Sequence, residues 1–226
     1  MCAITMKRTH EAGEQQQEQP RPRKVQRILM SSLPDRMRAA ATKETVSPQT
    51  VVLKTLAEDE HSVTVQSFSA LENFFHPPTE EEIAAYDHEA IAAIRTQNMD
   101  TLKQYHAEGR PLKCSNKFGE SLLHMACRKG MLQVTTFLTQ TANVPFQVCD
   151  DYGRSPLHDA CWAHTTNFEL VDLILTECPD LLYIQDKRGN TPLSYLKQEK
   201  WAAWNKYLAS KSADFLKPRF SSQLLA

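Results

Sequence analysis

Apolar residues recur at helical spacing along most of the chain beyond about residue 70, and only sparsely before it. The sequence TEEE at residues 79–82 predicts a capping box at the start of a helix. Residues 83–94 then carry an apolar face that is interrupted only at Asp87. A shorter helix is expected over residues 100–108, ending at Gly109. Further apolar faces lie over residues 132–138, 167–177 and 201–208. The pattern therefore predicts an all-α fold of short helices.

One short sequence motif, called the phrase below, occurs three times in this part of the chain. It appears as GESLLHMAC at residues 119–127, as GRSPLHDAC at 153–161 and as GNTPLSYL at 189–196. The leading glycines, at positions 119, 153 and 189, lie 34 and 36 residues apart. A period of this length indicates tandem structural repeats, each of which packs mainly on its neighbours.

The residues of the phrase are typical of the start of a helix. Ser or Thr provides the N-cap, Pro fits the first helical position, and His three residues after the cap can reach back to it as Glu or Gln does in a capping box. The preceding glycine suits a tight turn with positive φ. The residues expected to form turns and caps are Gly119, Ser121, His124, Gly153, Ser155, Pro156, His158, Gly189, Thr191 and Pro192.

Residues 155–160 resemble the Thr-Pro-Leu-His-x-Ala signature of the ankyrin repeat family. The chain departs from that pattern at Leu122, where proline is usual, at Met131, where histidine is usual, and at Ser194, where histidine is again usual. The resemblance implies an all-α helix-turn-helix repeat solenoid over residues 70–213. Its expected parts are an N-terminal capping pair (71–115), two full units (116–149 and 150–185) and a C-terminal cap (186–213).

The flanking segments differ from the repeats in composition. Residues 1–40 carry 8 basic and 4 acidic side chains (+4), whereas residues 41–80 carry 2 and 6 (−4). The N-terminal segment has few aromatic residues and no sustained period, so residues 1–69 are expected to form a disordered arm, basic and then acidic. Order is expected to begin near Leu71. Residues 51–53 and 63–68 have the composition of strands and could pair with a sheet edge of another chain, although a solvated linker is the favoured interpretation for both. Residues 214–226 are expected to form a loose tail.

Several classes of function find no support in the sequence. No apolar run approaches the ~18 residues of a membrane span. The first 40 residues carry a net charge of +4 and no aromatic residue, which gives little indication of nucleic-acid binding. The six cysteines include no C-x-x-C pair, which favours a reducing compartment, cytoplasmic or nuclear. The basic clusters between Lys7 and Lys24 resemble a bipartite nuclear import signal.

Two chemical hypotheses arise from the H-x-x-C pairs, His124/Cys127 and His158/Cys161. A zinc site is disfavoured, since equivalent positions in stacked units should lie about 8–10 Å apart and ligands lie ~2.0–2.3 Å from the metal. A Cys/His nucleophile is disfavoured, because residues 158, 159 and 161 of one short helix cannot converge on one substrate atom. We expect no catalytic residue, metal or cofactor.

The remaining hypothesis is a non-catalytic protein–protein interaction module, a docking or adaptor domain. The resemblance implies that a partner meets the turn tips and the concave side of the first helices. The residues at these positions are Lys117, Phe118, Glu120, Arg128, Lys129, Asp151, Tyr152, Arg154, Trp162, Lys187, Arg188 and Asn190. Their cations favour an acidic or phosphorylated partner segment, and the alternative is a solvated surface with incidental charge. A second hypothesis is a nuclear regulatory protein in which the repeats dock a partner while the basic arm directs nuclear import or contacts the transcriptional machinery. The oligomeric state is left open.

Overall fold

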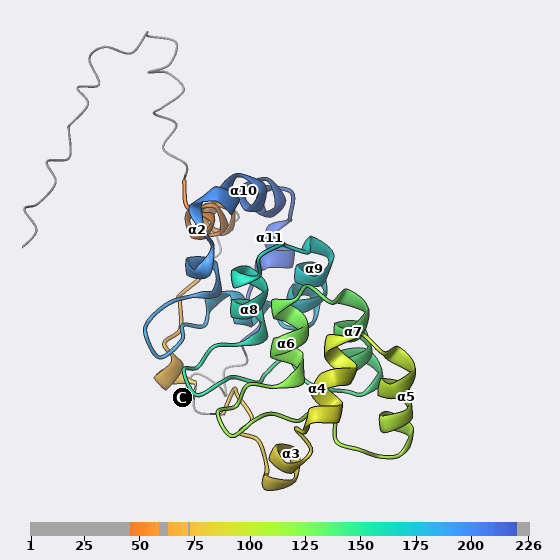
Figure 1. The fold of residues 1–226 in the computed structure, drawn as a ribbon. Coiled ribbons are helices and arrows are strands. Elements are labelled where there is room, and N and C mark those ends of the chain that lie inside the picture. Colours follow the sequence, from red (N-terminus) through yellow and green to blue (C-terminus); the bar gives the residue numbers. More distant parts are fainter. Residues whose placement is uncertain (1–45, 59–62, 72, 221–226) are drawn as a thin grey trace, which may run out of the picture. The chain divides into compact units, whose positions relative to one another are not determined.

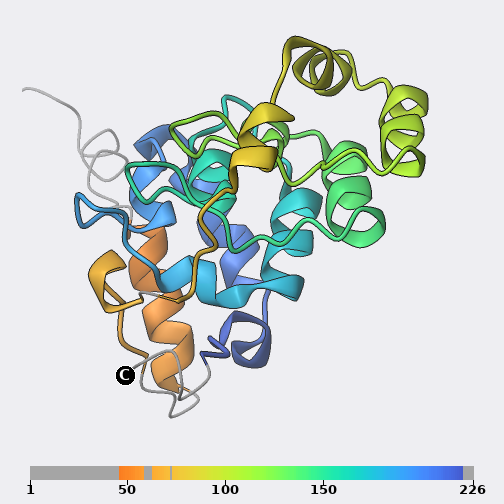
Figure 2. The same cartoon turned by 90° about the horizontal axis from the view of Figure 1, so that it is seen from below.

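A computed structural model describes residues 46–58, 63–71 and 73–220 of the chain (Figures 1 and 2). Within these ranges the regular structure is helical. Two isolated bridges, Gln66 to Ile184 and Ser115 to Ser121, are the β-type pairings found there. The predicted all-α fold is confirmed.

Three pairs of short helices follow one another in the chain (Figure 1). They are α4 (His88–Arg95) with α5 (Met99–Ala107), α6 (Leu122–Arg128) with α7 (Leu132–Thr136), and α8 (Pro156–Trp162) with α9 (Phe168–Glu177). Helix α6 packs between α4 and α8, and α7 packs on α9. Each helix is too short to be stable alone, so contacts between units hold the stack together.

Before the first pair, the capping box at Thr79 and Glu82 begins a separate short helix, α3 (Glu80–Ala84). The apolar face expected over residues 83–94 is therefore divided between two helices. Asp87, the residue that broke the apolar pattern, is the N-cap of α4, and its Oδ1 accepts a hydrogen bond from the backbone N–H of Ala90 at 2.9 Å. This hydrogen bond is the main reason that the pKa of Asp87 is lowered.

The fourth unit begins as a repeat and then changes. Pro192 starts a single 3-10 turn, η5 (Pro192–Tyr195), instead of an α-helix. A second 3-10 turn, η6 (Gln198–Lys200), leads directly into α10 (Trp201–Ala209). The second and third units end in short helical segments that are not α-helical, the wider π-helical η3 (Phe137–Thr141) after α7 and the tighter 3-10 helix η4 (Pro179–Tyr183) after α9.

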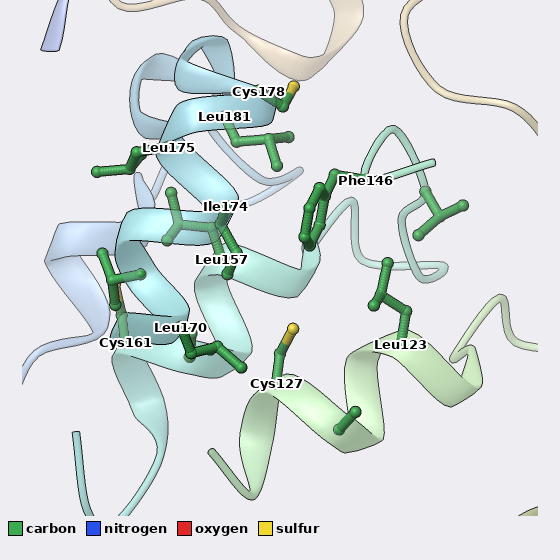
Figure 3. Packing of buried hydrophobic residues seen from close by; sticks show 14 of the residues in the cluster. Leu123, Cys127, Phe146, Leu157, Cys161, Leu170, Ile174, Leu175, Cys178 and Leu181 are labelled. Carbon is green, nitrogen blue, oxygen red and sulfur yellow. The ribbon is translucent and has the colours of Figure 1, made fainter. Parts of the chain in front are cut away.

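The core lies between the helix pairs and is made mainly of aliphatic side chains. Figure 3 shows Leu123 and Cys127 from α6 on the side of that helix toward Leu157 of α8, with Ile174 from α9 beside Leu157 and with Cys161 farther along α8, near Leu170. All six side chains are buried. The small cysteines let neighbouring helices approach closely.

The prediction that ordered structure begins near Leu71 is wrong, because part of the preceding segment is folded. Residues 48–58 form helix α2 (Pro48–Glu58), which packs against α10, the short α11 (Ala213–Leu216) and η5 (Figure 1). Val52 and Leu56 of α2 are buried. Gln49 accepts a hydrogen bond from Thr191 Oγ1 at 3.0 Å, and Val46 O accepts one from Asn205 Nδ2 at 2.7 Å. Residues 51–53 are thus helical, and their strand-like interpretation is wrong. Helix α2 covers the C-terminal end of the stack, which was expected to face solvent.

Residues 63–71 and 73–76 then follow the stack back toward its beginning (Figure 2). The backbone N–H of Gln66 donates to Tyr183 O, and Gln66 O accepts from the N–H of Gln185, both at 2.9 Å. Farther along, the N–H of His76 donates to Gln147 O at 3.1 Å. The short 3-10 helix η2 (Phe68–Ala70) lies between these contacts. The strand-like residues therefore pair within their own chain, and the linker interpretation is wrong for them.

The expected loose tail also needs correction. Leu216 of α11 is buried, and its carbonyl accepts a hydrogen bond from the Tyr183 hydroxyl at 2.5 Å. Phe220 packs against the core, edge-on to Phe74. The chain is thus folded at least to residue 220. The basic clusters between Lys7 and Lys24, and the last six residues, lie outside the described ranges.

Candidate functional site

The three turns that precede the repeated phrase are built in the same way. A side-chain oxygen of Asn116, Asp150 or Asp186 accepts hydrogen bonds from the backbone N–H groups two and four residues later, at 2.8–3.1 Å. Each turn is therefore closed on itself, and the residues at its tip project outward from a fixed backbone. Asn190, one of the expected contact residues, uses its backbone N–H in this way.

The turns are also joined to one another. The N–H of Asp151 donates to Phe118 O, and the N–H of Lys187 donates to Tyr152 O, both at 2.8 Å. Gly119 and Gly153 occupy the left-handed region, with φ of +77° and +78°. A Cβ atom on Gly119 would lie 2.6 Å from the carbonyl oxygen of Cys149, so no side chain fits at this turn. The successive tips consequently form one continuous edge.

The repeated histidines link each helix to the following turn. In the third unit, His158 Nδ1 accepts from the Ser155 backbone N–H at 3.1 Å and lies 2.9 Å from the Ser155 hydroxyl. A backbone N–H can only donate, so Nδ1 is unprotonated and Nε2–H donates to Asn190 O at 3.1 Å. His124 is placed equivalently between Ser121 and Arg154 O, with its Nε2 2.9 Å from that oxygen. Both ring nitrogens of each histidine are thus engaged in the scaffold.

The cysteines of the phrase are part of the core. Burial raises the pKa of the Cys127 and Cys161 thiols, so both remain protonated at neutral pH. Pro156 and Pro192 start their helical turns, and Thr191 Oγ1 lies 3.0 Å from Ser194 Oγ, where a histidine would stand in the pattern. The described part of the chain contains no cluster of three or more His, Cys, Asp or Glu side chains arranged to hold a metal ion.

Burial of His158 predicts a pH dependence of stability. Desolvation lowers its pKa from 6.5 to about 4, so between these values the unfolded chain binds a proton that the folded chain does not. We expect the free energy of unfolding to fall by up to roughly 3 kcal/mol as the pH is lowered from 7 to 4. The pKa values of Asp87 and Asp186 are lowered in the folded protein, so these carboxylates change the free energy of unfolding mainly below this pH range.

The measurement is urea unfolding as a function of pH for the wild type and His158→Gln, in which glutamine keeps a capping group at this position. The two proteins share every other ionisable group, so the comparison isolates the contribution of His158. The difference between the two proteins should be concentrated between pH 4 and 6.5. Parallel curves would contradict the assignment of His158 as a neutral buried ring.

Three aromatic side chains of the expected contact set are exposed at the edge and on the inner helix. Phe118, Tyr152 and Trp162 are 53%, 44% and 51% exposed. Each has a cation near its ring: Lys117 at 5.1 Å from Phe118, Arg154 and Arg188 at 5.2 and 4.6 Å from Tyr152, and Arg128 at 5.9 Å from Trp162. A hollow of about 290 Å³ lies between the first two tips. Exposed aromatics of this kind are typical anchors of protein interfaces.

Two of the expected contact cations are engaged inside the protein. Arg128 makes a two-pronged contact with the buried carboxylate of Asp159, at 3.1 and 2.9 Å, and also pairs with Glu120 at 2.7 Å. Arg154 pairs with Asp150 at 2.5 Å. Lys117, Lys129, Lys187 and Arg188 form no ion pair within residues 46–58, 63–71 and 73–220, although Lys187 Nζ donates to Asp151 O at 2.8 Å. The free positive charge of the surface is therefore smaller than the sequence suggested.

A groove of about 640 Å³ lies beside Trp162 and brings Arg128, Lys129 and Trp162 together. It also contains residues that sequence reasoning did not select, namely Met131, Ala163, His164, Thr165 and Lys197. Lys197 was missed because the fourth unit was interpreted only as a cap. Its position after η5 places it next to the end of α8, which no local pattern indicates. Lys187, Arg188 and Asn190 line the turn edge and take no part in this groove.

The geometry defines a helical repeat domain whose turns form a continuous recognition edge. Residues 90–182 match the family described as ankyrin repeats, in three copies. The match begins within α4 and ends within η4, so it spans the three helix pairs. This part of the chain therefore consists of ankyrin repeats.

The chain is also similar to three curated proteins, each named SMC5-SMC6 complex localization factor protein 1. It is 33% identical over 79 residues to the protein from Homo sapiens and to that from Bos taurus, which is 35% of this chain and 7% of each relative. It is 28% identical over 109 residues to the protein from Mus musculus, 41% of this chain and 10% of the relative. The chain thus spans a tenth or less of the length of these relatives.

No helix in the described ranges is both long and apolar enough to cross a membrane.

Proposed function

We propose that this protein is a non-catalytic docking module that recognises a protein partner through its turn tips and the concave side of its inner helices. The observation that carries the proposal is the row of exposed aromatics, Phe118, Tyr152 and Trp162, each next to a cation. Ankyrin repeats support a role in protein interaction. The histidines and cysteines that suggested enzyme or metal chemistry are engaged in caps and core, which supports a role without catalysis.

The partner in this proposal presents an acidic or phosphorylated segment. Lys117, Lys129 and Arg188 supply the charge, because Arg128 and Arg154 are neutralised internally. Exposed cations steer a partner of opposite charge and hold it weakly, whereas the aromatic side chains supply most of the affinity. Binding should therefore weaken with increasing salt concentration.

A double variant of the tips, Phe118→Ala with Tyr152→Ala, tests the proposal. We expect recovery of partners by affinity capture with the full chain to fall at least about tenfold, since truncating an aromatic anchor costs roughly 2 kcal/mol or more. Reversal of Lys117 and Arg188 to glutamate should also reduce recovery. Lys206→Ala, an exposed position on α10, is the control and should leave recovery unchanged. Equal recovery by the tip variant and the control, with unchanged thermal unfolding, would refute the proposal.

A second candidate function is favoured by the similarity to the localization factors. In it, the repeats position a larger protein assembly in the nucleus, and the basic clusters between Lys7 and Lys24 direct import or contact the transcriptional machinery. These clusters lie outside the described residues, so the support is the sequence and the relatives' name. A reporter fused to residues 1–40 should enter the nucleus if this function holds, and cytoplasmic retention of the reporter would count against it.

A further inference from the structure

The groove beside Trp162 has walls that are held in place by the rest of the fold. Lys200 Nζ donates to Ala163 O, in the segment after α8. Trp204 Nε1 donates to Thr166 Oγ1 at 3.3 Å, and Asn167 Nδ2 donates to Gly130 O at 3.1 Å. These contacts fix the loop between α8 and α9 at three points. A ligand entering the groove would meet a preorganised surface, which lowers the ordering cost of binding.

Trp162 is the apolar feature of this groove. It is the last residue of α8, and the helix ends sharply because Ala163 adopts φ −44° and ψ 143°. Half of the Trp162 side chain is exposed, and Arg128 lies near its ring. A large, rigid and partly exposed tryptophan in a concave setting is the residue type most enriched among interface hot spots.

The charge of the groove is positive. Lys129 and Lys197 are exposed and form no ion pair with described residues, and the exposed His164 also lines the groove. The described residues that line the groove include no Asp or Glu. Among nearby acids, Glu120 and Asp159 share Arg128, which balances one of their two negative charges, and Glu169 lines the adjoining hollow together with Lys129. The unpaired positive charge of the groove lining therefore comes from Lys129 and Lys197.

The available cations discriminate between two kinds of anionic ligand. Sites for phosphorylated peptides use free arginine forks, which match phosphate bidentately. The fork of Arg128 is already occupied by Asp159. The groove therefore offers two lysine ammonium groups together with an indole ring, which suits carboxylates carried next to an apolar side chain.

We propose that this groove binds an acidic peptide segment in which aspartate or glutamate residues flank an aromatic or aliphatic residue. The inference rests on the docking function proposed above and assigns a ligand class to one part of that surface. The apolar residue packs on Trp162, and the flanking carboxylates meet Lys129 and Lys197. The ligand is a segment of a protein partner.

The test uses the full chain and fluorescein-labelled hexapeptides, with fluorescence anisotropy as the readout. One peptide carries a phenylalanine flanked by aspartate and glutamate, a second replaces these by asparagine and glutamine, and a third places one phosphoserine in the neutral background. We expect the acidic peptide to bind at least about tenfold more tightly than the other two, with an affinity that falls as salt increases. Equal or tighter binding of the neutral or phosphorylated peptide would overturn the assignment.

The variants locate the site. Trp162→Ala should weaken the acidic peptide at least about tenfold, and Lys129→Glu with Lys197→Glu should abolish its binding. Lys206→Glu is the matched charge reversal outside the groove and should have no effect. Trp162 and both lysines are exposed, so the variants should fold, which thermal unfolding checks.

The two proposals fail in different ways. If the groove variants bind the acidic peptide as the wild type does, this inference is wrong, whatever the tip variants do in the capture experiment. If the tip variants retain all captured partners while the groove variants lose the peptide, the docking function through the tips is wrong and the groove assignment stands.

Discussion

Replacing Leu56 with alanine is expected to lower the free energy of unfolding by about 2–5 kcal/mol. Leu56 is 1% exposed, on the face of α2 that packs against the end of the repeat stack. Truncation would leave a cavity between α2 and its neighbours. The same change at Leu53, which is 37% exposed on the same helix, is the control and should cost less than about 1 kcal/mol.

Urea denaturation of the full chain and of both variants measures the difference. The comparison controls for helix propensity, because both substitutions are Leu→Ala within residues 48–58. Equal, small effects at the two positions would show that α2 contributes nothing to the stability of the stack. They would also restore residue 70 as the start of the folded unit.

Replacing Arg128 with methionine is expected to cost about 2–4 kcal/mol, because the carboxylate of Asp159, with a side chain only 3% exposed, loses its partner. The value is set below the range for a fully buried pair since Arg128 is itself a third exposed. Lys129→Met, at the next position but without an ion pair to a described residue, should change stability by about 0.5 kcal/mol or less.

Adding Asp159→Asn to Arg128→Met removes the unpaired charge and should recover part of the loss. Chemical denaturation of the four proteins checks both statements. A double variant no more stable than Arg128→Met alone would mean that the ion pair is not the cause. The prediction also has a practical result: charge reversal at Arg128 would disturb the fold, so it cannot be used to test binding.

The sequence was sufficient for the parts of the fold that are encoded locally. Ser155, Pro156 and His158 form a helix cap within four residues. The spacing of 34 and 36 residues between the leading glycines predicts a stack of repeats. The buried face of α2 was missed because it consists of Pro48, Val52 and Leu56 in an 11-residue helix flanked by polar sequence. Its partners in α10 and α11 lie far away in the chain, and no local pattern identifies them.

The candidate surface shows the same division. The positions of Phe118 and Tyr152 at the turn tips follow from the repeat. The pairing of Arg128 with Asp159 connects two neighbouring units across 31 residues, and the sequence gives no sign that it consumes a cation of the expected binding set. Lys197 joins the groove only because the fourth unit turns back toward α8, through a 3-10 helix where the pattern favours an α-helix.

The docking of α2 has a consequence for how the protein is made. Gln49 and its partner Thr191 are 142 residues apart, and synthesis at about 5–20 residues per second places roughly 7–28 s between their emergence from the ribosome. During that interval Val52 and Leu56 have no surface to cover them. The repeats can form successively as they emerge, since each packs mainly on its neighbour. Closure by α2 therefore follows the emergence of α10 and α11 from the exit tunnel.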